Sequence, residues 1–156
     1  MPKLNTNNEE VKEYLLGVSK YWIEEVGIDG WRLDVCDEVD HEFWRTFKKT
    51  IKKANKNAVI IGEIMHEASS FLRGDQLDSI MNYPFKLAMV DFFAHNNISA
   101  EEFDSVLALN RSLYMDSITK QMWNLIGSHD TMRFLTECSD DVDRMKLAIS
   151  FQFTYL

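Results

Sequence analysis

The sequence predicts an α/β fold with a parallel sheet, and the arrangement of its apolar residues supports this. Apolar residues recur every three or four positions in some segments, as in helices, and form alternating or β-branched runs in others, as in strands. These segments come in the order helix, strand, helix, strand, strand, helices, strand and helix, which is typical of parallel βα units. Polar residues cluster after the predicted strands, at the edge where α/β enzymes carry their chemistry.

The first half of the chain contains two predicted helices and two predicted strands. A helix is expected over residues 8–26, where apolar side chains are spaced by three or four, and Gly27 is a typical stop signal. Residues 29–35 alternate between apolar and polar side chains, which predicts a strand. Asp40 is a candidate N-cap for the second helix, and the β-branched run at residues 59–61 predicts a buried parallel strand.

The second half is expected to contain two more strands and several helices. Gly74 closes a short predicted helix, and the last helix is apolar up to the end of the chain. The expected elements are a helix at 69–73, a strand at 77–82, helices at 85–95 and 100–109, a strand at 123–126 and a helix at 141–156.

Composition indicates a globular domain and argues against several classes of function. The 156 residues are 46% hydrophobic and 12% aromatic, which argues against disorder. There is no run of about 18 apolar residues, so no membrane-spanning helix is expected, and the first residues do not resemble a signal peptide. Acidic residues outnumber basic ones by 25 to 17, a net charge of −8, so we expect neither nucleic acid nor an anionic membrane as partner.

The cysteines and histidines predict neither a disulfide framework nor a metal site. Cys36 and Cys138 are expected to be free thiols, which favours a reducing compartment such as the cytoplasm. The four histidines do not fall at metal-ligand spacing with each other or with cysteine, so a zinc site is not expected. We expect Cys36 to fill space in the core rather than to react.

Two further patterns are expected to be structural. Six basic residues between Arg45 and Lys56 fall at helical spacing opposite an apolar face, which predicts a solvated helix face rather than an anion-binding patch. Trp22, Trp31 and Trp44 fall on apolar faces, so they are expected in the core rather than as platforms for a sugar.

Three carboxylates are the strongest candidates for chemistry, because each follows a predicted strand. Asp34 and Glu63 are 29 residues apart, close to one βα unit, and Asp130 comes 67 residues after Glu63, near two units. In a (β/α)8 TIM barrel such strand ends would meet at one mouth. A complete barrel needs about 250 residues, so a chain with about four parallel strands and their helices would form a partial barrel, about half of one.

The neighbours of these acids suggest different roles for them. Arg32 lies on the same side of its strand as Asp34, where a guanidinium would lower the pKa of Asp34 and keep it charged. Burial and the charge of Asp34 would raise the pKa of Glu63. One charged and one protonated carboxyl suit glycoside cleavage, with Asp130 stabilising positive charge on the sugar and His129 binding its hydroxyls.

Other interpretations of these residues stay open. A single acid at a strand end is most often a helix cap or part of a surface ion pair. Three acids at barrel strand ends can also hold Mg²⁺ for proton abstraction from a carbon acid, although Arg32 would repel the metal. A barrel fragment without catalytic activity is a further alternative.

Four motifs resemble conserved regions of the α-amylase family, glycoside hydrolase family 13, and they occur in the family's order. The segment Asp29-Gly-Trp-Arg-Leu-Asp-Val35 is similar to its second region and Gly62-Glu-Ile-Met-His66 to its third. Ser128-His-Asp-Thr131 is similar to the fourth region, and Met1-Pro-Lys-Leu-Asn5 resembles the fifth. Together they span nearly the whole chain.

Three segments are most similar to one branch of that family, which contains neopullulanases, cyclomaltodextrinases and maltogenic amylases. They are residues 1–5, 38–44 and 81–85. The resemblance implies a hydrolase that cleaves α-1,4-glucosidic bonds in cyclodextrins, pullulan or maltooligosaccharides with retention of configuration, with transglycosylation as a possible second outcome. The implied partner is therefore an α-glucan oligosaccharide.

The resemblance also assigns catalytic roles to the three acids. Asp34 would be the nucleophile, Glu63 the general acid/base and Asp130 the stabiliser of the transition state.

Three further residues would orient the nucleophile or contact the sugar. Arg32 would orient the nucleophile, His129 would bind the sugar in the subsite where cleavage occurs, and Glu38 would lie near the acceptor side. No cofactor or metal is implied for this segment, although a calcium ion is possible elsewhere in the full-length protein.

The chain departs from that branch in three residues and in extent. Cys36-Asp37 stand where the branch usually has Ala-Asn, and Met65 stands in place of a tryptophan that would stack on an acceptor sugar. The N-terminal half of the barrel, the inserted loop domain and the C-terminal sandwich have no counterpart here. Residues 1–156 are therefore expected to be a fragment covering family strands 4 to 7, inactive alone and self-associated through its open sheet edges.

Overall fold

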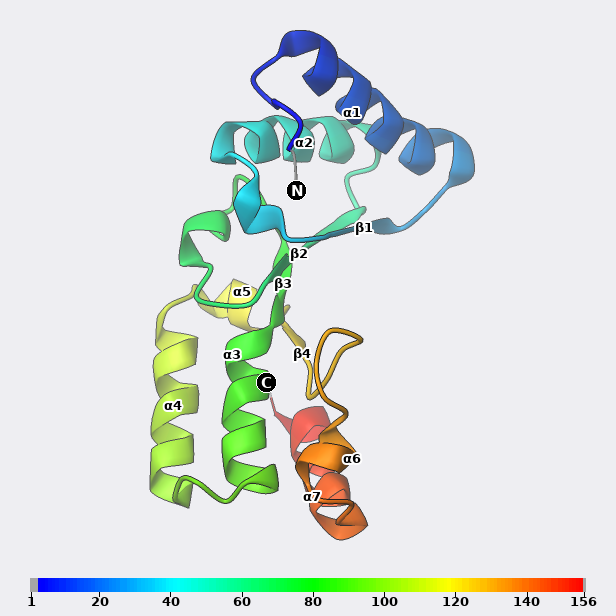
Figure 1. The fold of residues 1–156 in the computed structure, drawn as a ribbon. Helices are drawn as coiled ribbons and strands as arrows, with labels where there is room; N and C mark the ends of the chain where they lie inside the picture. Colours follow the sequence, from blue (N-terminus) through cyan, green and yellow to red (C-terminus); the bar gives the residue numbers. More distant parts are fainter. Residues whose placement is uncertain (1–2, 156) are drawn as a thin grey trace. The chain divides into compact units, whose positions relative to one another are not determined.

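The computed structural model describes residues 3–155, which divide into two compact units (Figure 1). The first unit contains the chain up to Ile64 and the segment Ala68–Ile80, and the second contains Met65–Glu67 and the chain from Met81 onward. The first two residues of the motif similar to the fifth conserved region lie outside the described residues.

Four strands follow one another in the sheet in chain order. β1 pairs with β2 in parallel, with Gly30 opposite Val59, and β3 pairs with β4 in parallel, with Met81 opposite Trp123. Parallel strands joined by helices confirm the predicted α/β class. The strands are β1 (Gly30–Leu33), β2 (Val59–Ile64), β3 (Ser79–Asn82) and β4 (Trp123–Asn124).

The first strand is shorter than expected at its end. At Gly30 the strands approach so closely that a Cβ would lie 2.1 Å from the Val59 carbonyl oxygen, so glycine is required there. The strand ends at Leu33 because Val35 has a left-handed backbone, with φ 41°, which interrupts the extended chain. Asp34 and Val35 therefore lie in the turn that follows β1 rather than within the strand.

Both α-helices of the first unit begin at a residue whose side chain caps the helix. In α1 (Glu9–Tyr21) the Asn8 side chain accepts a hydrogen bond from the Val11 N–H. In α2 (His41–Ala54) Asp40 accepts from the Phe43 N–H at 2.8 Å, which confirms the predicted cap. The buried face of α2 consists of Phe43, Trp44, Phe47 and Ile51.

The expectation that Trp22 lies in the core is wrong. After α1 the chain continues as a π-helical turn, η1 (Trp22–Val26), whose wider hydrogen-bonded loops turn a different side chain inward. Ile23 is buried instead, and Trp22 is 43% exposed. Trp44 is buried as expected, while Trp31 is half-buried and donates its indole N–H to the Ser19 carbonyl at 3.3 Å.

Asp78 binds two of the basic side chains that were expected on a solvated face. Lys48 Nζ lies 2.8 Å from Asp78 Oδ1, and Lys52 Nζ lies 2.6 Å from Oδ2. The Ile60 N–H donates to Asp78 Oδ2 at 3.0 Å. Because the side chains of Asp78 and Lys48 are each only 16% exposed, this part of α2 is bound to the segment between β2 and β3 rather than solvated.

We expect Asp78→Asn to destabilise the chain by about 1–2 kcal/mol at pH 7, because it removes a charged acceptor from two lysines. Burial alone raises the pKa of Asp78, but the bonds from Lys48 and Lys52 outweigh it and hold the pKa below its ordinary value. The stabilisation is therefore present above the unfolded pKa of about 3.9 and is lost as the pH falls through the folded pKa. Urea unfolding at a series of pH values measures this.

The matched control for that variant is Asp116→Asn. Asp116 also pairs with a lysine, Lys120 at 2.7 Å, but its side chain is 82% exposed. Its loss is expected to cost less than about 0.5 kcal/mol. An Asp78 variant as stable as this control at pH 7, or a stability difference that persists unchanged below pH 4, would contradict the assignment.

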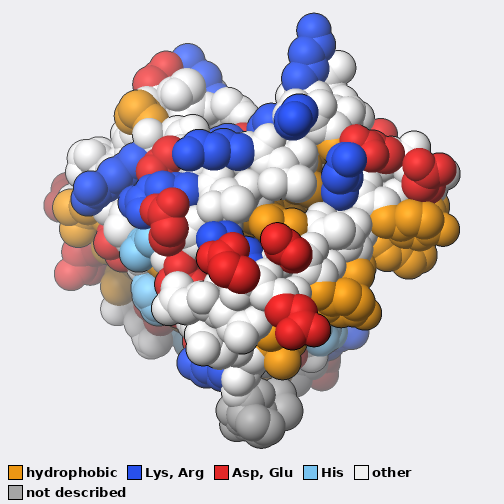
Figure 2. Space-filling view, turned by 90° about the horizontal axis from the view of Figure 1, so that it is seen from above, with side chains coloured by type: hydrophobic (Ala, Val, Ile, Leu, Met, Phe, Trp, Pro, Cys, Tyr) orange, Lys and Arg blue, Asp and Glu red, His pale blue; other side chains and the backbone are white. Residues whose placement is uncertain are grey.

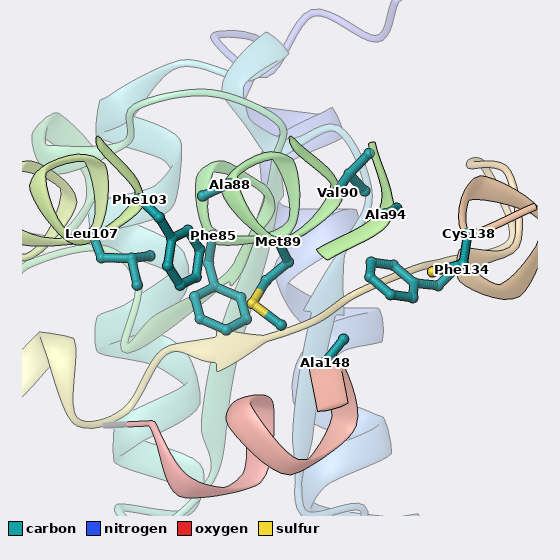
Figure 3. Close-up of a cluster of buried hydrophobic side chains, with 10 residues drawn as sticks. All are labelled: Phe85, Ala88, Met89, Val90, Ala94, Phe103, Leu107, Phe134, Cys138 and Ala148. Carbon is teal, nitrogen blue, oxygen red and sulfur yellow. The ribbon is translucent and has the colours of Figure 1, made fainter. Parts of the chain in front are cut away.

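The second unit is built on an aromatic core (Figure 3). Phe85 and Met89 are fully buried in it, together with Phe103, Phe134 and Cys138. The helical segments around this core are α3 (Tyr83–Met89), the π-helical turn η4 (Val90–Ala94), α4 (Ala100–Ser112), α5 (Asp116–Thr119), α6 (Phe134–Glu137) and α7 (Val142–Thr154).

Three short elements were not predicted from the sequence. They are α5, α6 and a 3-10 turn, η2 (Cys36–Glu38). The short helix expected at residues 69–73 is instead a 3-10 turn, η3 (Ser69–Phe71). The fourth strand ends at Asn124, two residues earlier than expected.

The surface and the thiols agree with the composition. Charged side chains of both signs cover the face shown in Figure 2, with hydrophobic side chains exposed among them. Cys36 and Cys138 are both free, as expected, and both are buried, which was predicted only for Cys36. Within residues 3–155 we find no helix with the length and hydrophobicity needed to cross a membrane.

Candidate active site

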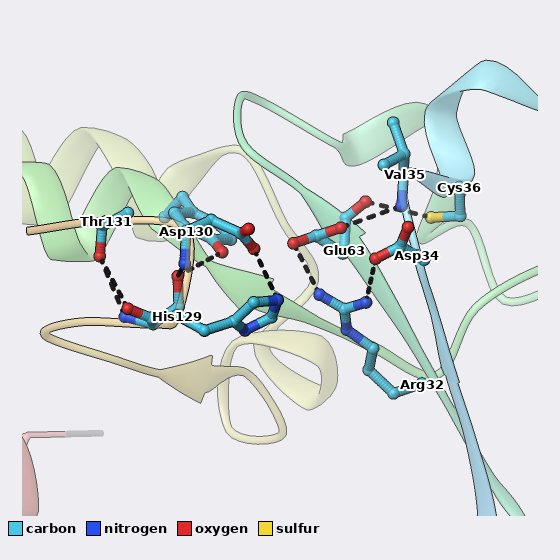
Figure 4. Close-up of polar contacts among 10 residues, drawn as sticks. Arg32, Asp34, Val35, Cys36, Glu63, His129, Asp130 and Thr131 are labelled. Carbon is cyan, nitrogen blue, oxygen red and sulfur yellow. Dashed lines mark hydrogen bonds and ion pairs between the residues drawn. The ribbon is translucent and has the colours of Figure 1, made fainter. Parts of the chain in front are cut away.

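Arg32 joins two of the three predicted acids. It lies in β1, opposite Ile61 of β2, and its guanidinium contacts Asp34 through Nη1 (Figure 4). Its Nη2 lies 2.6 Å from Glu63 Oε1. The Glu63 side chain is only 4% exposed, whereas that of Asp34 is 74% exposed. One arginine therefore holds a buried and an accessible carboxylate at the ends of two neighbouring parallel strands.

The backbone after Asp34 provides a second contact to Glu63. The Val35 N–H donates to Glu63 Oε2 at 3.0 Å, so each oxygen of this carboxylate accepts a bond (Figure 4). Val35 does this in a left-handed conformation, which is unfavourable for a β-branched residue. Strain of this kind persists where surrounding contacts enforce it, and it is concentrated at functional sites.

Cys36 packs against the backbone of Glu63. It is fully buried, and its Sγ lies 3.6 Å from the Glu63 carbonyl oxygen. A Cβ on Gly62 would lie 2.7 Å from this sulfur, so the glycine makes room for the thiol. Burial, together with the charge of Asp37, raises the pKa of Cys36 to about 12. The thiol therefore stays protonated and fills space, as the sequence predicts.

Glu38 lies at an open cavity of about 830 Å³ in the first unit. Arg32 and Asp34 line the same cavity, whose other walls are mainly apolar and include Trp31 and Phe43. The Glu38 carboxylate lies 2.8 Å from Lys3 Nζ in an exposed ion pair. The cavity thus combines polar side chains at β1 with an apolar wall, as small-molecule sites commonly do.

His129 and Asp130 lie together in the second unit. His129 Nε2 is 3.0 Å from Asp130 Oδ2, and both side chains are partly or largely exposed (Figure 4). They stand on a turn in which the Ser128 N–H donates to Thr131 Oγ1 at 3.0 Å. Because β4 ends at Asn124, Asp130 lies on a loop beyond the strand rather than at its end.

The structure thus brings Arg32, Asp34 and Glu63 into contact in one unit, with Glu38 on the same cavity. It pairs His129 with Asp130 in the other unit. Sequence analysis missed the Val35 N–H, because a backbone donor has no residue-type signal. The positive φ of a valine was equally invisible in the alternating pattern.

Comparison with known proteins gives a consistent result. The model of the α-amylase catalytic domain matches residues 1–155. The chain is 57% identical over its full length to a cyclomaltodextrinase of Thermoanaerobacter pseudethanolicus and covers 27% of that protein. It is 53% identical over its full length to neopullulanase 2 of Thermoactinomyces vulgaris and covers 26% of it.

A solved structure agrees with these relatives. The whole chain superposes on 27% of a cyclomaltodextrinase chain with a TM-score of 0.98 and 52% sequence identity. The chain therefore spans about a quarter of the length of the proteins it matches, in the part that forms four strands of a TIM barrel. From the catalytic-domain match over residues 1–155, we conclude that the chain belongs to the α-amylase family of glycoside hydrolases.

Proposed function

We propose that the protein to which this chain belongs hydrolyses α-1,4-glucosidic bonds in cyclodextrins, pullulan or maltooligosaccharides. The observation that carries this proposal is the contact of Arg32 with both Asp34 and Glu63 at the ends of β1 and β2. The names of the similar cyclomaltodextrinase and neopullulanase support the choice of substrates. Because both cysteines are free thiols, we place the protein in the cytoplasm.

In this proposal the two carboxyl groups have different roles, Asp34 as nucleophile and Glu63 as general acid and base. Asp34 is accessible and held by a cation, so it attacks the anomeric carbon and forms a covalent glycosyl ester. Glu63 is buried and donates a proton to the leaving oxygen, and it then takes a proton from the water that hydrolyses the ester. Asp130 stabilises positive charge on the sugar ring, and His129 binds a sugar hydroxyl.

We expect the α anomer to be the first product released. Retaining enzymes hold their two carboxyl groups about 5–5.5 Å apart, and inverting enzymes about 6.5–9.5 Å apart to admit a water. One guanidinium that bonds both Asp34 and Glu63 favours the shorter separation. Proton NMR of the earliest product of the full-length protein tests this, and a β anomer before mutarotation would contradict the double displacement.

A magnesium-dependent proton abstraction is not favoured by this geometry. Arg32 lies against both acids, where its charge would repel a metal ion. Within the described part of the chain, no group of three histidine, cysteine or acidic side chains is placed to bind a metal ion.

The 156-residue chain by itself is expected to self-associate and to release no sugar. β1 and β4 are the outer strands of its sheet, and an outer strand offers backbone groups to a second chain. Gln152 Nε2 donates to the Asn124 carbonyl at 2.8 Å and protects part of β4, so we expect β1 to be the main contact. Sedimentation equilibrium and a reducing-sugar assay measure both properties. A monomer at every concentration, or turnover that Glu63→Gln abolishes, would contradict them.

A further inference from the structure

Tyr83 is the first residue of α3 and directly follows β3, and its hydroxyl reaches the loop that carries His129 and Asp130. The side chain is 3% exposed, and its hydroxyl donates to Ser128 Oγ at 3.1 Å. The tyrosine belongs to the segment 81–85 that the proposed chemistry does not use. A phenylalanine would fill the same apolar space, so packing alone does not account for the hydroxyl.

The elements around Tyr83 hold it in place. Asn82 ends β3 and caps α3, because its Oδ1 accepts from the Phe85 N–H at 3.2 Å. Asn82 Nδ2 also donates to Asn124 Oδ1 of β4 at 2.8 Å, and Asn110 Nδ2 donates to Asn82 Oδ1 at 3.1 Å. The residue before Tyr83 is therefore held by hydrogen bonds to β4 and to α4, and these fix the backbone from which the Tyr83 side chain projects.

The Ser128 hydroxyl passes this restraint on to Asp130. Besides the bond from Tyr83, Ser128 Oγ accepts the Asp130 N–H at 3.2 Å. The Thr131 hydroxyl accepts the Ser128 N–H at 3.0 Å and closes the turn. Two hydrogen bonds through Ser128 Oγ thus connect the Asp130 N–H to the buried Tyr83 side chain. The side chain of Asp130 is nevertheless 42% exposed.

We propose that Tyr83 is a positioning residue, whose hydroxyl fixes the His129–Asp130 loop through Ser128. The consequence for catalysis rests on the proposed function, because it requires Asp130 to act on the sugar. If Asp130 stabilises charge that develops in the transition state, a loosened loop lowers kcat more than it raises KM. A residue that served only to pack the core would change neither quantity selectively.

The experiment compares Tyr83→Phe, Ser128→Ala and the double variant in the full-length protein. Hydrogen exchange of a peptide covering residues 127–132 is expected to rise roughly five- to tenfold in Tyr83→Phe, the ratio for loss of one hydrogen bond. The double variant is expected to match Ser128→Ala, because both changes break one connection. On a maltooligosaccharide, kcat is expected to fall about tenfold in Tyr83→Phe with KM changed less than twofold.

Tyr155→Phe is the matched control. It removes another tyrosine hydroxyl of the same unit, which accepts a bond from Arg111 Nη1 at 2.6 Å. Exchange of residues 127–132 and kcat are expected to stay at their original values in this variant. Equal effects of the two tyrosine variants would show a general loss of stability and would overturn the proposal.

Two other outcomes separate this inference from the proposed function. Unchanged exchange of the loop in Tyr83→Phe, or additive effects in the double variant, would overturn the positioning role even if the protein hydrolyses glucans. Raised exchange in a protein that shows no glucan hydrolysis would support the positioning role and refute the proposed function.

Discussion

Asp34→Ala is expected to abolish turnover of the full-length protein on α-glucans, by a factor on the order of 10⁴ or more, because it removes the proposed nucleophile. The vacated space leaves room for a small anion. Azide is therefore expected to restore part of the activity and to yield a glycosyl azide, which mass spectrometry or NMR detects. Asp34 is largely exposed, so the loss should not come from unfolding.

Glu63→Gln is expected to respond differently, because it removes proton transfer and not the nucleophile. General acid catalysis contributes typically about 10²–10⁴-fold, and a good leaving group needs little of it. Activity on an aryl maltooside with an acidic phenol should therefore be largely kept in the first step, while activity on maltooligosaccharides is lost. If both variants responded alike to azide and to the leaving group, the roles of Asp34 and Glu63 would be wrong.

Arg32→Ala is expected to destabilise the first unit by about 2–3 kcal/mol. Removing one partner of a buried ion pair costs roughly 3–5 kcal/mol, and the Arg32 side chain is 30% exposed, which reduces the cost. The loss arises because the buried Glu63 side chain loses the charged group that bonds its Oε1. Urea unfolding of the chain, followed by circular dichroism, measures it.

The double variant Arg32→Ala/Glu63→Gln tests that explanation. A neutral glutamine needs no counter-charge, so the double variant should regain part of the stability lost in Arg32→Ala. Lys3→Ala is the control, since Lys3 forms an exposed pair with Glu38 and should contribute less than about 1 kcal/mol. A double variant less stable than Arg32→Ala would show that lost packing, and not the unpaired carboxylate, causes the effect.

Features that depend only on residues three or four positions apart were predicted correctly from the sequence. Asp40 caps α2 because its side chain reaches the N–H of Phe43, three residues away. The apolar spacing that follows identifies the buried face of α2 for the same reason, since residues three and four apart share a face. Elements of three or four residues, such as α5 and η2, are too short for any spacing to repeat, and they were missed.

Some side chains were predicted in the wrong environment, because the spacing of residues describes a regular helix taken by itself. The apolar spacing of residues 8–26 is correct for a regular helix, but the π-helical turn at Trp22–Val26 changes which residue faces inward. Lys48 and Lys52 have the spacing of a solvated face, and only the fold brings Asp78 to them. A helical period reports one element at a time and contains no information about what the fold places against it.

The sequence by itself determined the order of the strands and of the longer helices, and it determined the positions of Arg32, Asp34 and Glu63 at the ends of two neighbouring strands. Only the tertiary structure decided that the Val35 N–H, 28 residues from Glu63, turns toward its carboxylate. It also decided that Tyr83 bonds to Ser128, 45 residues away. The physical reason is that hydrogen bonds between distant residues depend on the backbone path of both segments, which packing of the whole unit sets and local residue patterns do not encode.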